Sequence, residues 1–527
     1  MTNLMVIILI LSPLIWVTHI NYLFNILQQH YYSNGRLIKV LKSNFNSEKY
    51  YKKMAFLGII FCLGIALITL LSPSSAMLTI FMLMISYFYI NRENKFIIVP
   101  LKITPRIKRL YFVVLLILES ILFLGLKMPF AEITNYLFTL FILSLVLPVI
   151  VIISNTLSFP VEISIKRKYL NKAKNKIKEI PDLKIIGITG SYGKTTTKNI
   201  LYNILSSRYQ VVATPKSFNT VNGISKTVNE ELNRLTQVFI AEMGVDSLGG
   251  MEKHLKFLKP KYAIINNIGN MHLATFKSVE NVLKEKMKLA YAIDQTGVVV
   301  LNNDNEYISQ INFANIKAKI VTFGIEKEAD VMAKNIKFNS EGSKFDLCLK
   351  DEVYKVAIPL IGRHNIENTI ASIALALELG VEINNIVKSL KFLKPIPHRL
   401  EIVKEDNITF LDDSYNSNFV GFKNALEIIK GFKEYKVLIT PGMVELGEES
   451  YNLNKQLCPF IKDSVDEVIF IRNEVIKAME EGLEELEFSN IKVFDSFKDA
   501  RMYVKEKYNE NRVVVLIEND LPDSYIK

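Results

Sequence analysis

The chain has 527 residues, a formal net charge of +11 and three cysteines, and half of its residues are hydrophobic. This length suffices for about three domains, and the apolar content exceeds that of an ordinary soluble protein. The scattered cysteines exclude a disulfide framework and fit a reducing compartment. Residues 1–180 carry 20 Lys and Arg against 6 Asp and Glu, whereas the rest carries 44 against 47. The basic excess is therefore no argument for a nucleic-acid partner.

Apolar residues concentrate before residue 160, in five runs close to the roughly 20 residues that a helix needs to cross a bilayer. The runs are Leu4–Ile20, Met54–Leu71, Ala76–Ile90, Leu110–Leu126 and Tyr136–Ile153. Residues 1–160 are therefore predicted to form an all-α transmembrane bundle of about five helices. The first run lacks a basic start and a small-residue cleavage site, which favours an anchor over a removed signal peptide.

Charge orients these predicted spans. Basic residues cluster in segments 21–53 and 91–109 and after the last run, whereas segments 72–75 and 127–134 carry almost none. By the positive-inside rule the N-terminus lies outside and everything after residue 160 lies in the cytoplasm. We expect a multi-pass protein of the inner or plasma membrane, with the lipid bilayer as a partner. Residues 161–180 read as a basic, helical connector.

Two features of this region can each be explained either by a function or by ordinary membrane-protein structure. Glu119 lies at the centre of the fourth run, where a carboxylate is costly and either serves a function or is protonated and hydrogen-bonded between helices. The basic residues of segment 102–109 could hold an anionic lipid headgroup, but the positive-inside rule alone would also explain them.

A phosphate-binding pattern begins at residue 184. The apolar run Lys184–Ile188 leads into I-T-G-S-Y-G-K-T-T-T-K and an amphipathic helix. Glycines in such a loop let backbone N–H groups converge on an anion at a helix N-terminus, where a lysine reaches the β- and γ-phosphates and a hydroxyl binds Mg²⁺. The pattern predicts that ATP is held by Gly190, Ser191, Gly193, Lys194, Thr195 and Thr196. The strict motif would place glycine at position 188, so a glycine-rich turn with an incidental lysine is the alternative.

After this loop, apolar runs alternate with helical patterns, as in a mostly parallel sheet. Strands are predicted at Val211–Thr214, Gln237–Ala241, Tyr262–Asn266 and Gly297–Leu301, and residues 330–360 change to the period of antiparallel strands. Ligands of such sheets lie beyond the carboxyl ends of the strands. Glu242 and His272 follow two of the predicted strands and are candidate metal ligands.

The predicted helix Ser278–Ile293 contains a misfit. Its apolar stripe would continue at position 286, which is a lysine. Lys286 could extend its amine to the rim of the protein. Alternatively, CO₂ carbamylates it, and the resulting carboxylate shares a metal with His272.

The next predicted helix begins with G-R-H-N-I-E-N. Asn365 and Asn368 lie on one face, beside His364, where their amides could read a purine edge; helix capping is the alternative. A proline-containing linker at residues 391–399 leads to a second alternating block. Its first strand ends in L-D-D-S-Y-N-S-N, and its second leads into P-G-M-V-E-L-G-E. This block predicts a second doubly wound domain.

Taken together, these motifs resemble the Mur ligase family, and within it the branch that adds D-alanyl-D-alanine to the peptidoglycan precursor. They include E-M-G, N-I-G-N-M-H, G-R-H-N-I-E-N, the H-R after the linker and D-D-S-Y-N, in order over residues 181–527. The resemblance implies a P-loop-type central ATPase domain at 181–395 and a Rossmann-like C-terminal domain at 396–527. These two α/β domains would follow the transmembrane region (1–160) and the connector (161–180).

The implied activity is an ATP-dependent, ADP-forming amide ligase for cell-wall precursors. The acceptor would be a UDP- or lipid-linked peptide, and the amine an amino acid or dipeptide. A substrate carboxylate attacks the γ-phosphate, and an amine displaces phosphate from the acyl phosphate. The implied cofactors are ATP and two Mg²⁺ ions.

The resemblance also implies a role for each matching residue. Thr195 and Glu242 would hold one Mg²⁺ ion, and His272 with carbamylated Lys286 the second. His364, Asn365 and Asn368 would contact adenine. The remaining roles are Arg399 at the γ-phosphate, Asp413 at the ribose or phosphate, and Tyr415 and Asn416 at the incoming amine.

Three departures limit what the resemblance implies. The family's N-terminal UDP-sugar domain is replaced by the apolar region, Lys216 and Ser217 stand where glycine and asparagine are expected, and Phe419 replaces a small residue or proline. Two alternatives remain open: a membrane-bound ligase that makes γ-linked polyglutamate, and a membrane transport NTPase with Glu119 on its pathway.

Overall fold

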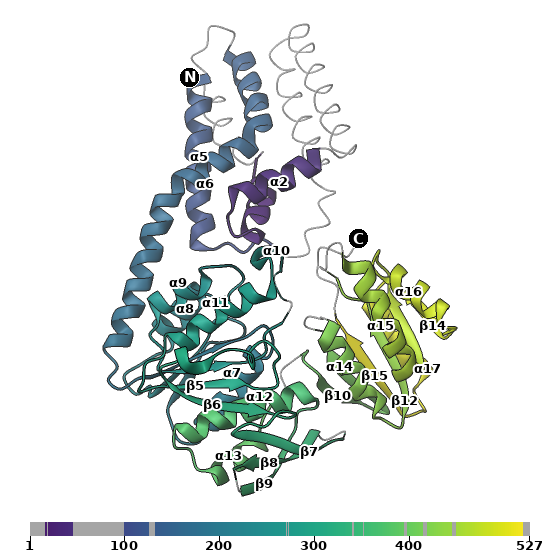
Figure 1. The fold of residues 1–527 in the computed structure, drawn as a ribbon. Coiled ribbons are helices and arrows are strands. Elements are labelled where there is room, and N and C mark those ends of the chain that lie inside the picture. Colours follow the sequence, from purple (N-terminus) through teal and green to yellow (C-terminus); the bar gives the residue numbers. More distant parts are fainter. Residues whose placement is uncertain are drawn as a thin grey trace. The chain divides into compact units, whose positions relative to one another are not determined.

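The computed structural model describes two compact units, formed by residues 1–168 and 169–526. Figure 1 shows the ribbon of the chain. The described residues are 16–17, 19–45, 100–125, 132–269, 271, 273–339, 342–350, 352–394, 398–414, 419–444 and 449–519. The predicted spans Met54–Leu71 and Ala76–Ile90, and most of Leu4–Ile20, lie outside these ranges.

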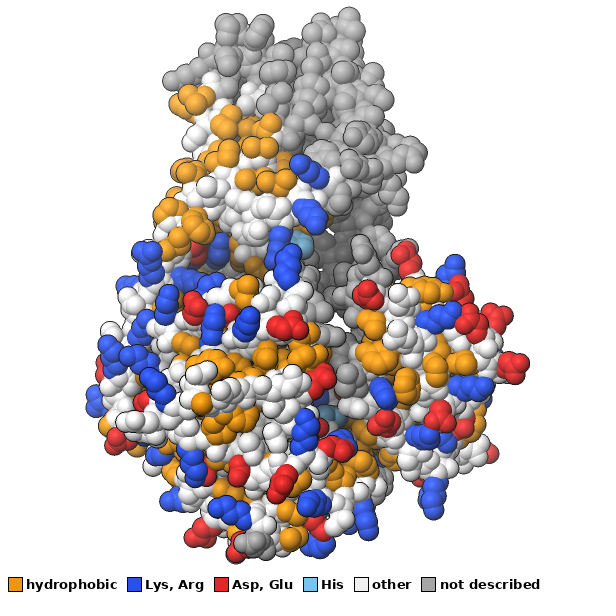
Figure 2. Space-filling view, in the orientation of Figure 1, with side chains coloured by type: hydrophobic (Ala, Val, Ile, Leu, Met, Phe, Trp, Pro, Cys, Tyr) orange, Lys and Arg blue, Asp and Glu red, His pale blue; other side chains and the backbone are white. Residues whose placement is uncertain are grey.

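The first unit is helical. Its elements are α2 (Asn34–Phe45), α5 (Pro105–Gly125) and most of α6 (Glu132–Lys178), with a further helical stretch at residues 19–29. Apolar side chains from these segments, among them Trp16, Leu27, Leu110 and Leu147, form one core. Several large outward-facing side chains of α5 and α6 are apolar as well, and Figure 2 shows hydrophobic patches on this unit with other atoms between them.

One helix of the described part, Val146–Lys178, is long and apolar enough to cross a membrane. The predicted bundle of five spans is therefore not supported, because the described residues contain one such helix, which overlaps the end of the predicted fifth run and extends beyond it. The predicted span Leu110–Leu126 lies in α5 as far as Gly125, and this apolar part of the helix is only about 24 Å long at 1.5 Å per residue. The predicted connector 161–180 is helical as far as Lys178. It belongs to the same helix as the predicted fifth span, because α6 continues through both Pro148 and Pro160.

The central domain contains a nine-stranded sheet in the order β2-β3-β1-β4-β5-β6-β7-β8-β9. Strands β2 to β7 are parallel to their neighbours, and β7, β8 and β9 pair in antiparallel fashion. The strands are β1 (Lys184–Thr189), β2 (Val211–Ala213), β3 (Val238–Glu242), β4 (Tyr262–Ile265), β5 (Val298–Asn302), β6 (Lys319–Gly324), β7 (Val331–Asn339), β8 (Gly342–Leu349) and β9 (Glu352–Ile358). The predicted parallel sheet with an antiparallel edge is confirmed, although sequence analysis missed β6.

Helices cover both faces of this sheet, which explains why its inner strands are apolar on both sides. One core joins the sheet to α7, α12 and α13, and another joins it to α8, α9 and α11. The helices are α7 (Lys194–Leu205), α8 (Val221–Glu230), α9 (Gly250–Phe257), α10 (Leu273–Phe276), α11 (Val279–Tyr291), α12 (Arg363–Glu378) and α13 (Ile383–Leu390), with a 3₁₀ turn at Phe313–Asn315.

The C-terminal domain has a six-stranded sheet in the order β10-β11-β15-β12-β13-β14. Only β10 is antiparallel to its neighbour, and the remaining pairs are parallel, as the alternating pattern predicted. Its strands are β10 (Glu401–Glu405), β11 (Ile408–Asp413), β12 (Tyr435–Thr440), β13 (Glu467–Ile471), β14 (Ile491–Phe494) and β15 (Val513–Glu518). Its helices are α14 (Phe419–Lys430), α15 (Ser450–Ser464), α16 (Ile476–Glu485) and α17 (Phe497–Lys507).

Candidate active site

The glycine-rich loop joins β1 to α7 at the carboxyl edge of the central sheet. Gly190 has φ 153° and Gly193 has φ 79° with left-handed backbone geometry directly before α7. A Cβ on Gly193 would lie 2.3 Å from Oδ1 of Asn368. Glycine is therefore required at position 193 by backbone conformation and by space. Ile188 is a buried residue of β1, which explains why the motif has no glycine there.

Lys194, the first residue of α7, lies folded over this loop. Its Nζ donates to the carbonyl oxygens of Gly190 at 2.8 Å and Ser191 at 2.9 Å. Burial lowers its pKa to about 8, Glu242 opposes this shift, and Arg399 adds to it. Lys194 thus lies at the phosphate loop, as predicted, and a neighbouring anion would raise its pKa again by stabilising the charged amine.

Glu242 ends β3 beside the loop and is almost completely buried. Its Oε2 accepts from the hydroxyl of Thr195 at 3.0 Å and from Nζ of Lys198 at 3.3 Å, and its Oε1 accepts from Asn219 at 3.2 Å. A buried carboxylate beside a hydroxyl is an oxygen donor set suited to Mg²⁺. The predicted pairing of Thr195 with Glu242 is present in the structure, and both residues fit the predicted ion.

Lys198 was not among the predicted site residues. Its side chain is 1% exposed, and besides Glu242 it donates to the carbonyl oxygen of Lys216. Lys216 has φ 48°, the backbone region favoured by glycine, which is the residue expected from the family resemblance. The substitution therefore keeps the loop conformation at the cost of backbone strain, and Lys198 ties that loop to the carboxylate of Glu242.

Lys286 lies in α11 and is 2% exposed, so the amine does not extend to the protein surface. Burial lowers its pKa to about 7; the charge of Lys194 lowers it further, while Glu285 and Asp246 oppose the shift. A neutral amine is the form that reacts with CO₂, so the residue fits the predicted modification. His272, the predicted partner of the modified lysine, lies outside the described residues.

The start of α12 contributes to the loop in a way that sequence analysis did not foresee. Asn368 is 4% exposed, and its Oδ1 accepts from the hydroxyl of Thr197 at 3.1 Å and from Asn266 at 3.3 Å. Asn365 is equally buried, and its amide donates to the carbonyl oxygen of Ile361 at 2.7 Å. Neither caps the helix, which was the alternative interpretation, since the cap residue is Gly362. Their contact with adenine stays a prediction, and Asn368 in addition fixes the phosphate loop.

His364 is half-buried, and burial lowers the pKa of its imidazole to about 4, with a smaller contribution from Arg399. The ring is therefore neutral at physiological pH and can accept or donate a hydrogen bond. This protonation state is compatible with the predicted contact to a purine ring.

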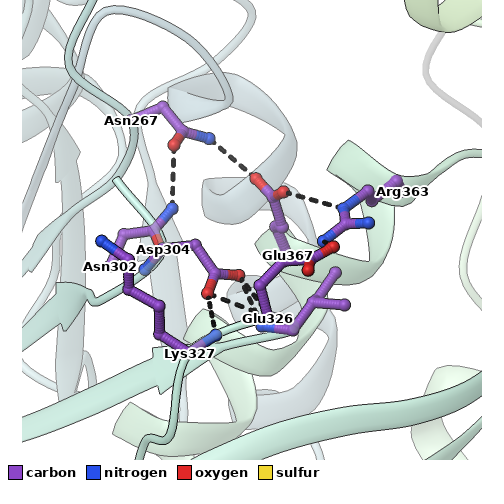
Figure 3. A network of polar contacts seen from close by, with 8 residues as sticks. Asn267, Asn302, Asp304, Glu326, Lys327, Arg363 and Glu367 are labelled. Carbon is purple, nitrogen blue, oxygen red and sulfur yellow. Dashed lines mark hydrogen bonds and ion pairs between the residues drawn. The ribbon is translucent and has the colours of Figure 1, made fainter. Parts of the chain in front are cut away.

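A polar network beyond the ends of β4 and β5 was missed entirely (Figure 3). Asn267 donates to Glu367 at 2.8 Å and accepts from Asn302 at 2.8 Å. Asp304 accepts from the backbone N–H groups of Ile325, Glu326 and Lys327, which fixes the turn after β6. The segment L-N-N-D-N-E at the end of β5 carried the signal, because it places polar residues at the edge of a parallel sheet where ligands usually bind.

The first strands of the C-terminal domain carry the remaining predicted residues. Asp413 ends β11, and its Oδ1 accepts from the N–H of Leu400 at 3.1 Å. Burial raises the pKa of Asp413 to about 6, against the opposing effects of that hydrogen bond and Arg399. The positive charge of Arg399 lowers the pKa values of Lys194 and His364, and its contact with the γ-phosphate stays a prediction. Tyr415 and Asn416 lie outside the described residues.

Comparison with known proteins agrees with these motifs. The Mur ligase middle domain matches residues 188–376, and the Mur ligase glutamate ligase domain matches residues 398–517. A UDP-N-acetylmuramoyl-tripeptide–D-alanyl-D-alanine ligase of Borreliella burgdorferi is 33% identical over 331 residues, which cover 61% of this chain and 69% of that protein. The chain belongs to the Mur ligase family. This membership confirms the predicted enzyme class, a ligase.

Other relatives bear the same name. The ligase of Buchnera aphidicola subsp. Baizongia pistaciae is 30% identical over 304 residues, covering 57% of this chain and 66% of the relative. The Escherichia coli ligase is 31% identical over 274 residues, covering 51% of this chain and 59% of the relative. The chain therefore spans about two thirds or less of these two relatives, and residues 1–187 precede both matched domains.

Solved structures show the same architecture. The structure of MurF from Acinetobacter baumannii has 26% identity and a TM-score of 0.61, covering 67% of this chain and 77% of that chain. MurF ligase from Thermotoga maritima, solved in complex with ADP, has 22% identity and a TM-score of 0.60, covering 67% of this chain and 80% of that chain. The two predicted α/β domains thus have the Mur ligase fold.

Proposed function

We propose that this protein is an ATP-dependent amide ligase of cell-wall precursor synthesis, which joins a peptide carboxylate to the amine of a D-alanyl-D-alanine-type dipeptide. The observation that carries the proposal is the buried carboxylate of Glu242, bonded to Thr195 at the mouth of a phosphate loop in a member of the Mur ligase family. The names of the relatives support the dipeptide as the added group. The ADP in the Thermotoga structure supports ATP as the phosphate donor.

Within this proposal, charge neutralisation and positioning supply the catalysis. The loop amides and Lys194 hold the phosphates, and Arg399 approaches the γ-phosphate. Thr195 and Glu242 bind one Mg²⁺ ion, while carbamylated Lys286 and His272 bind a second. These ions neutralise phosphate charge when they are bound. Asp413 contacts the nucleotide, and Tyr415 and Asn416 line the amine site.

We also propose that the first unit anchors the enzyme in the plasma membrane, with both α/β domains in the cytoplasm. Large apolar side chains are exposed on α5 (Phe112, Leu116, Phe123 and Leu124) and on α6 (Val149, Leu157 and Phe159). An exposed apolar surface of this kind is stable in lipid and a liability in water. Because this anchor precedes the matched Mur domains, we propose a lipid-linked peptide as the carboxylate substrate.

The proposal is tested by phosphate release from ATP with full-length enzyme in detergent. The assay crosses two acceptors, a UDP-linked and a lipid-linked muropeptide, with D-alanyl-D-alanine, glutamate or no amine. We expect release that requires an acceptor together with D-alanyl-D-alanine and that is faster with the lipid-linked acceptor. A requirement for glutamate would favour a polyglutamate ligase, and release without any acceptor would exclude amide ligation. Preference for the UDP-linked acceptor would exclude the lipid-linked substrate.

A further inference from the structure

The first unit contains a polar cluster between its helices, formed by Tyr32, Arg106, Arg109, Asn155 and Glu162. The guanidinium of Arg106 lies over the ring of Tyr32, 3.7 Å from its centroid, and its Nη2 donates to Oδ1 of Asn155 at 3.5 Å. The cluster lies between the first turns of α5 and the middle of α6, so its residues come from three separate segments of the chain.

The turn that carries Tyr32 is held by hydrogen bonds to Asn155. Tyr31 and Tyr32 have φ values of 55° and 59°, a strained conformation for two consecutive aromatic residues. The buried amide of Asn155 stabilises this turn by donating to the carbonyl oxygen of Tyr32 at 3.0 Å and to Asn34 at 2.7 Å. Hydrogen bonds from α6 and α2 residues therefore hold the turn that carries the ring under Arg106.

The charges of the cluster do not balance. Arg109 binds the carboxylate of Glu162 through both Nε and Nη2, at 2.7 Å in each case. Arg106 approaches the same carboxylate only to 4.0 Å, and its buried Nε has no hydrogen-bond partner among the described residues. Two guanidinium groups thus share one carboxylate, and among the described residues Glu162 is the only anion within 4.0 Å of the half-buried Arg106. A partly desolvated cation of this kind is stabilised by an anion that reaches it from outside.

We propose that Arg106 binds the phosphate headgroup of an anionic membrane lipid. Its planar guanidinium can donate two parallel hydrogen bonds to phosphate oxygens while it remains stacked on Tyr32. The exposed apolar side chains of α5 and α6 would pack against the acyl chains of the same lipid. This inference rests on the proposed membrane placement of the first unit.

A comparison of Arg106 with Lys108 can distinguish a specific headgroup site from a general attraction between basic residues and an anionic membrane. Lys108 lies two residues from Arg106 on α5 and therefore on the opposite side of the helix, and it is exposed. A general electrostatic attraction would weaken equally when either cation is removed. A headgroup site would depend on Arg106 alone.

The test uses full-length protein in a zwitterionic detergent and follows thermal unfolding by the fluorescence of Trp16, the only tryptophan of the chain, which lies in the core of this unit. Short-chain phosphatidylglycerol, short-chain phosphatidylcholine and inorganic phosphate are titrated separately. The variants are Arg106→Gln, Arg106→Lys and Lys108→Gln. A ligand that binds the folded unit raises the unfolding midpoint with increasing concentration.

We expect phosphatidylglycerol to stabilise the wild type and the Lys108→Gln variant alike, with apparent affinities within twofold. Arg106→Gln should lose at least tenfold in affinity. Arg106→Lys, which keeps the charge and is the fallback if Arg106→Gln does not fold, should lose at least threefold. Equal losses in Arg106→Gln and Lys108→Gln would overturn the site, as would equal stabilisation by phosphatidylcholine. Equal stabilisation by inorganic phosphate would overturn the lipid as its ligand. Partition of the same variants into the membrane fraction tests the anchor itself. A variant that stays in the membrane fraction but loses affinity for phosphatidylglycerol reports on the site alone.

Discussion

The hydroxyl of Thr195, in the first turn of α7, lies 3.0 Å from Oε2 of Glu242, the last residue of β3. Two segments 47 residues apart thus present two oxygen donors to one point beside the phosphate loop. The arrangement explains why a hydroxyl is needed directly after Lys194, and it leads to the first prediction.

Replacing Thr195 with alanine should reduce ATP-dependent phosphate release by about 100-fold or more and raise the Mg²⁺ concentration needed for half-maximal rate, because one oxygen ligand is lost. Thr195→Ser keeps the hydroxyl and serves as the matched control, with activity within a few-fold of the wild type. The measurement is initial rate against Mg²⁺ concentration. Equal activity of the alanine and serine variants would remove Thr195 from the metal site.

Gly193→Ala should destabilise the central domain by roughly 2–4 kcal/mol, because its Cβ would strain a left-handed residue and collide with Asn368. Gly249, with φ 78° and open space around a Cβ, is the matched control. There alanine should cost only about 1–2 kcal/mol of backbone strain. Thermal unfolding of the two full-length variants compares them, and equal midpoints would show that Asn368 moves away freely.

Carbamylation of Lys286 predicts a characteristic pH dependence. Its pKa of about 7 means that the neutral amine, which reacts with CO₂, predominates above pH 7 and is depleted below it. Enzyme depleted of CO₂ should therefore regain activity on addition of bicarbonate faster at pH 8 than at pH 6, with rates normalised to dissolved CO₂.

The Lys286→Ala variant supplies the control for this experiment. It should be inactive at both pH values and partly restored by a short-chain carboxylic acid, which supplies the missing carboxylate. Unchanged turnover of the variant would refute the carbamate.

The ionised carboxylate of Asp413 should destabilise the folded state near neutral pH. Its pKa is raised from 3.8 to about 6, so the folded state holds the proton more tightly than the unfolded state. The favourable contribution is present below about pH 4 and is lost as pH rises through 6. Asp413→Asn should therefore be more stable than the wild type at pH 7.5, on the order of 1–3 kcal/mol, and similar to it at pH 4.

Activity of the Asp413→Asn variant is expected to fall, because the carboxylate is proposed to contact the nucleotide. Thermal unfolding at the two pH values and the rate of phosphate release measure both effects. A variant less stable than the wild type at pH 7.5 would contradict the assigned cause of the pKa shift.

The strands that line the site are predictable from the sequence because their apolar runs are continuous and end in polar residues, as at Glu242. The sequence pattern does not reveal every strand. It missed β6 and β10, whose residues are only partly buried and lack that signature. It also treated α6 as a span and a separate connector, since the change from apolar to basic composition at residue 160 hid the continuity of the backbone.

The contacts of individual polar side chains were less predictable. Asn368 and Lys198 were recognisable as parts of motifs, but their partners Asn266, Thr197 and Lys216 lie far away in the sequence. The Asn267–Glu367 pair depends on how β4 faces α12, which no local pattern specifies. Periodicity reports which face of an element is buried, and tertiary geometry decides which polar groups meet there.

The central claim is that a carboxylate is activated by transfer of the γ-phosphate of ATP. The most direct measurement uses an acceptor peptide with ¹⁸O in its terminal carboxylate, together with ATP and D-alanyl-D-alanine, and determines the isotope content of the released phosphate by mass spectrometry. Attack by the carboxylate on the γ-phosphate, followed by displacement by the amine, leaves one ¹⁸O atom in each phosphate. Released phosphate that carries no ¹⁸O would contradict the account, because it would show that water and not the acceptor attacks ATP.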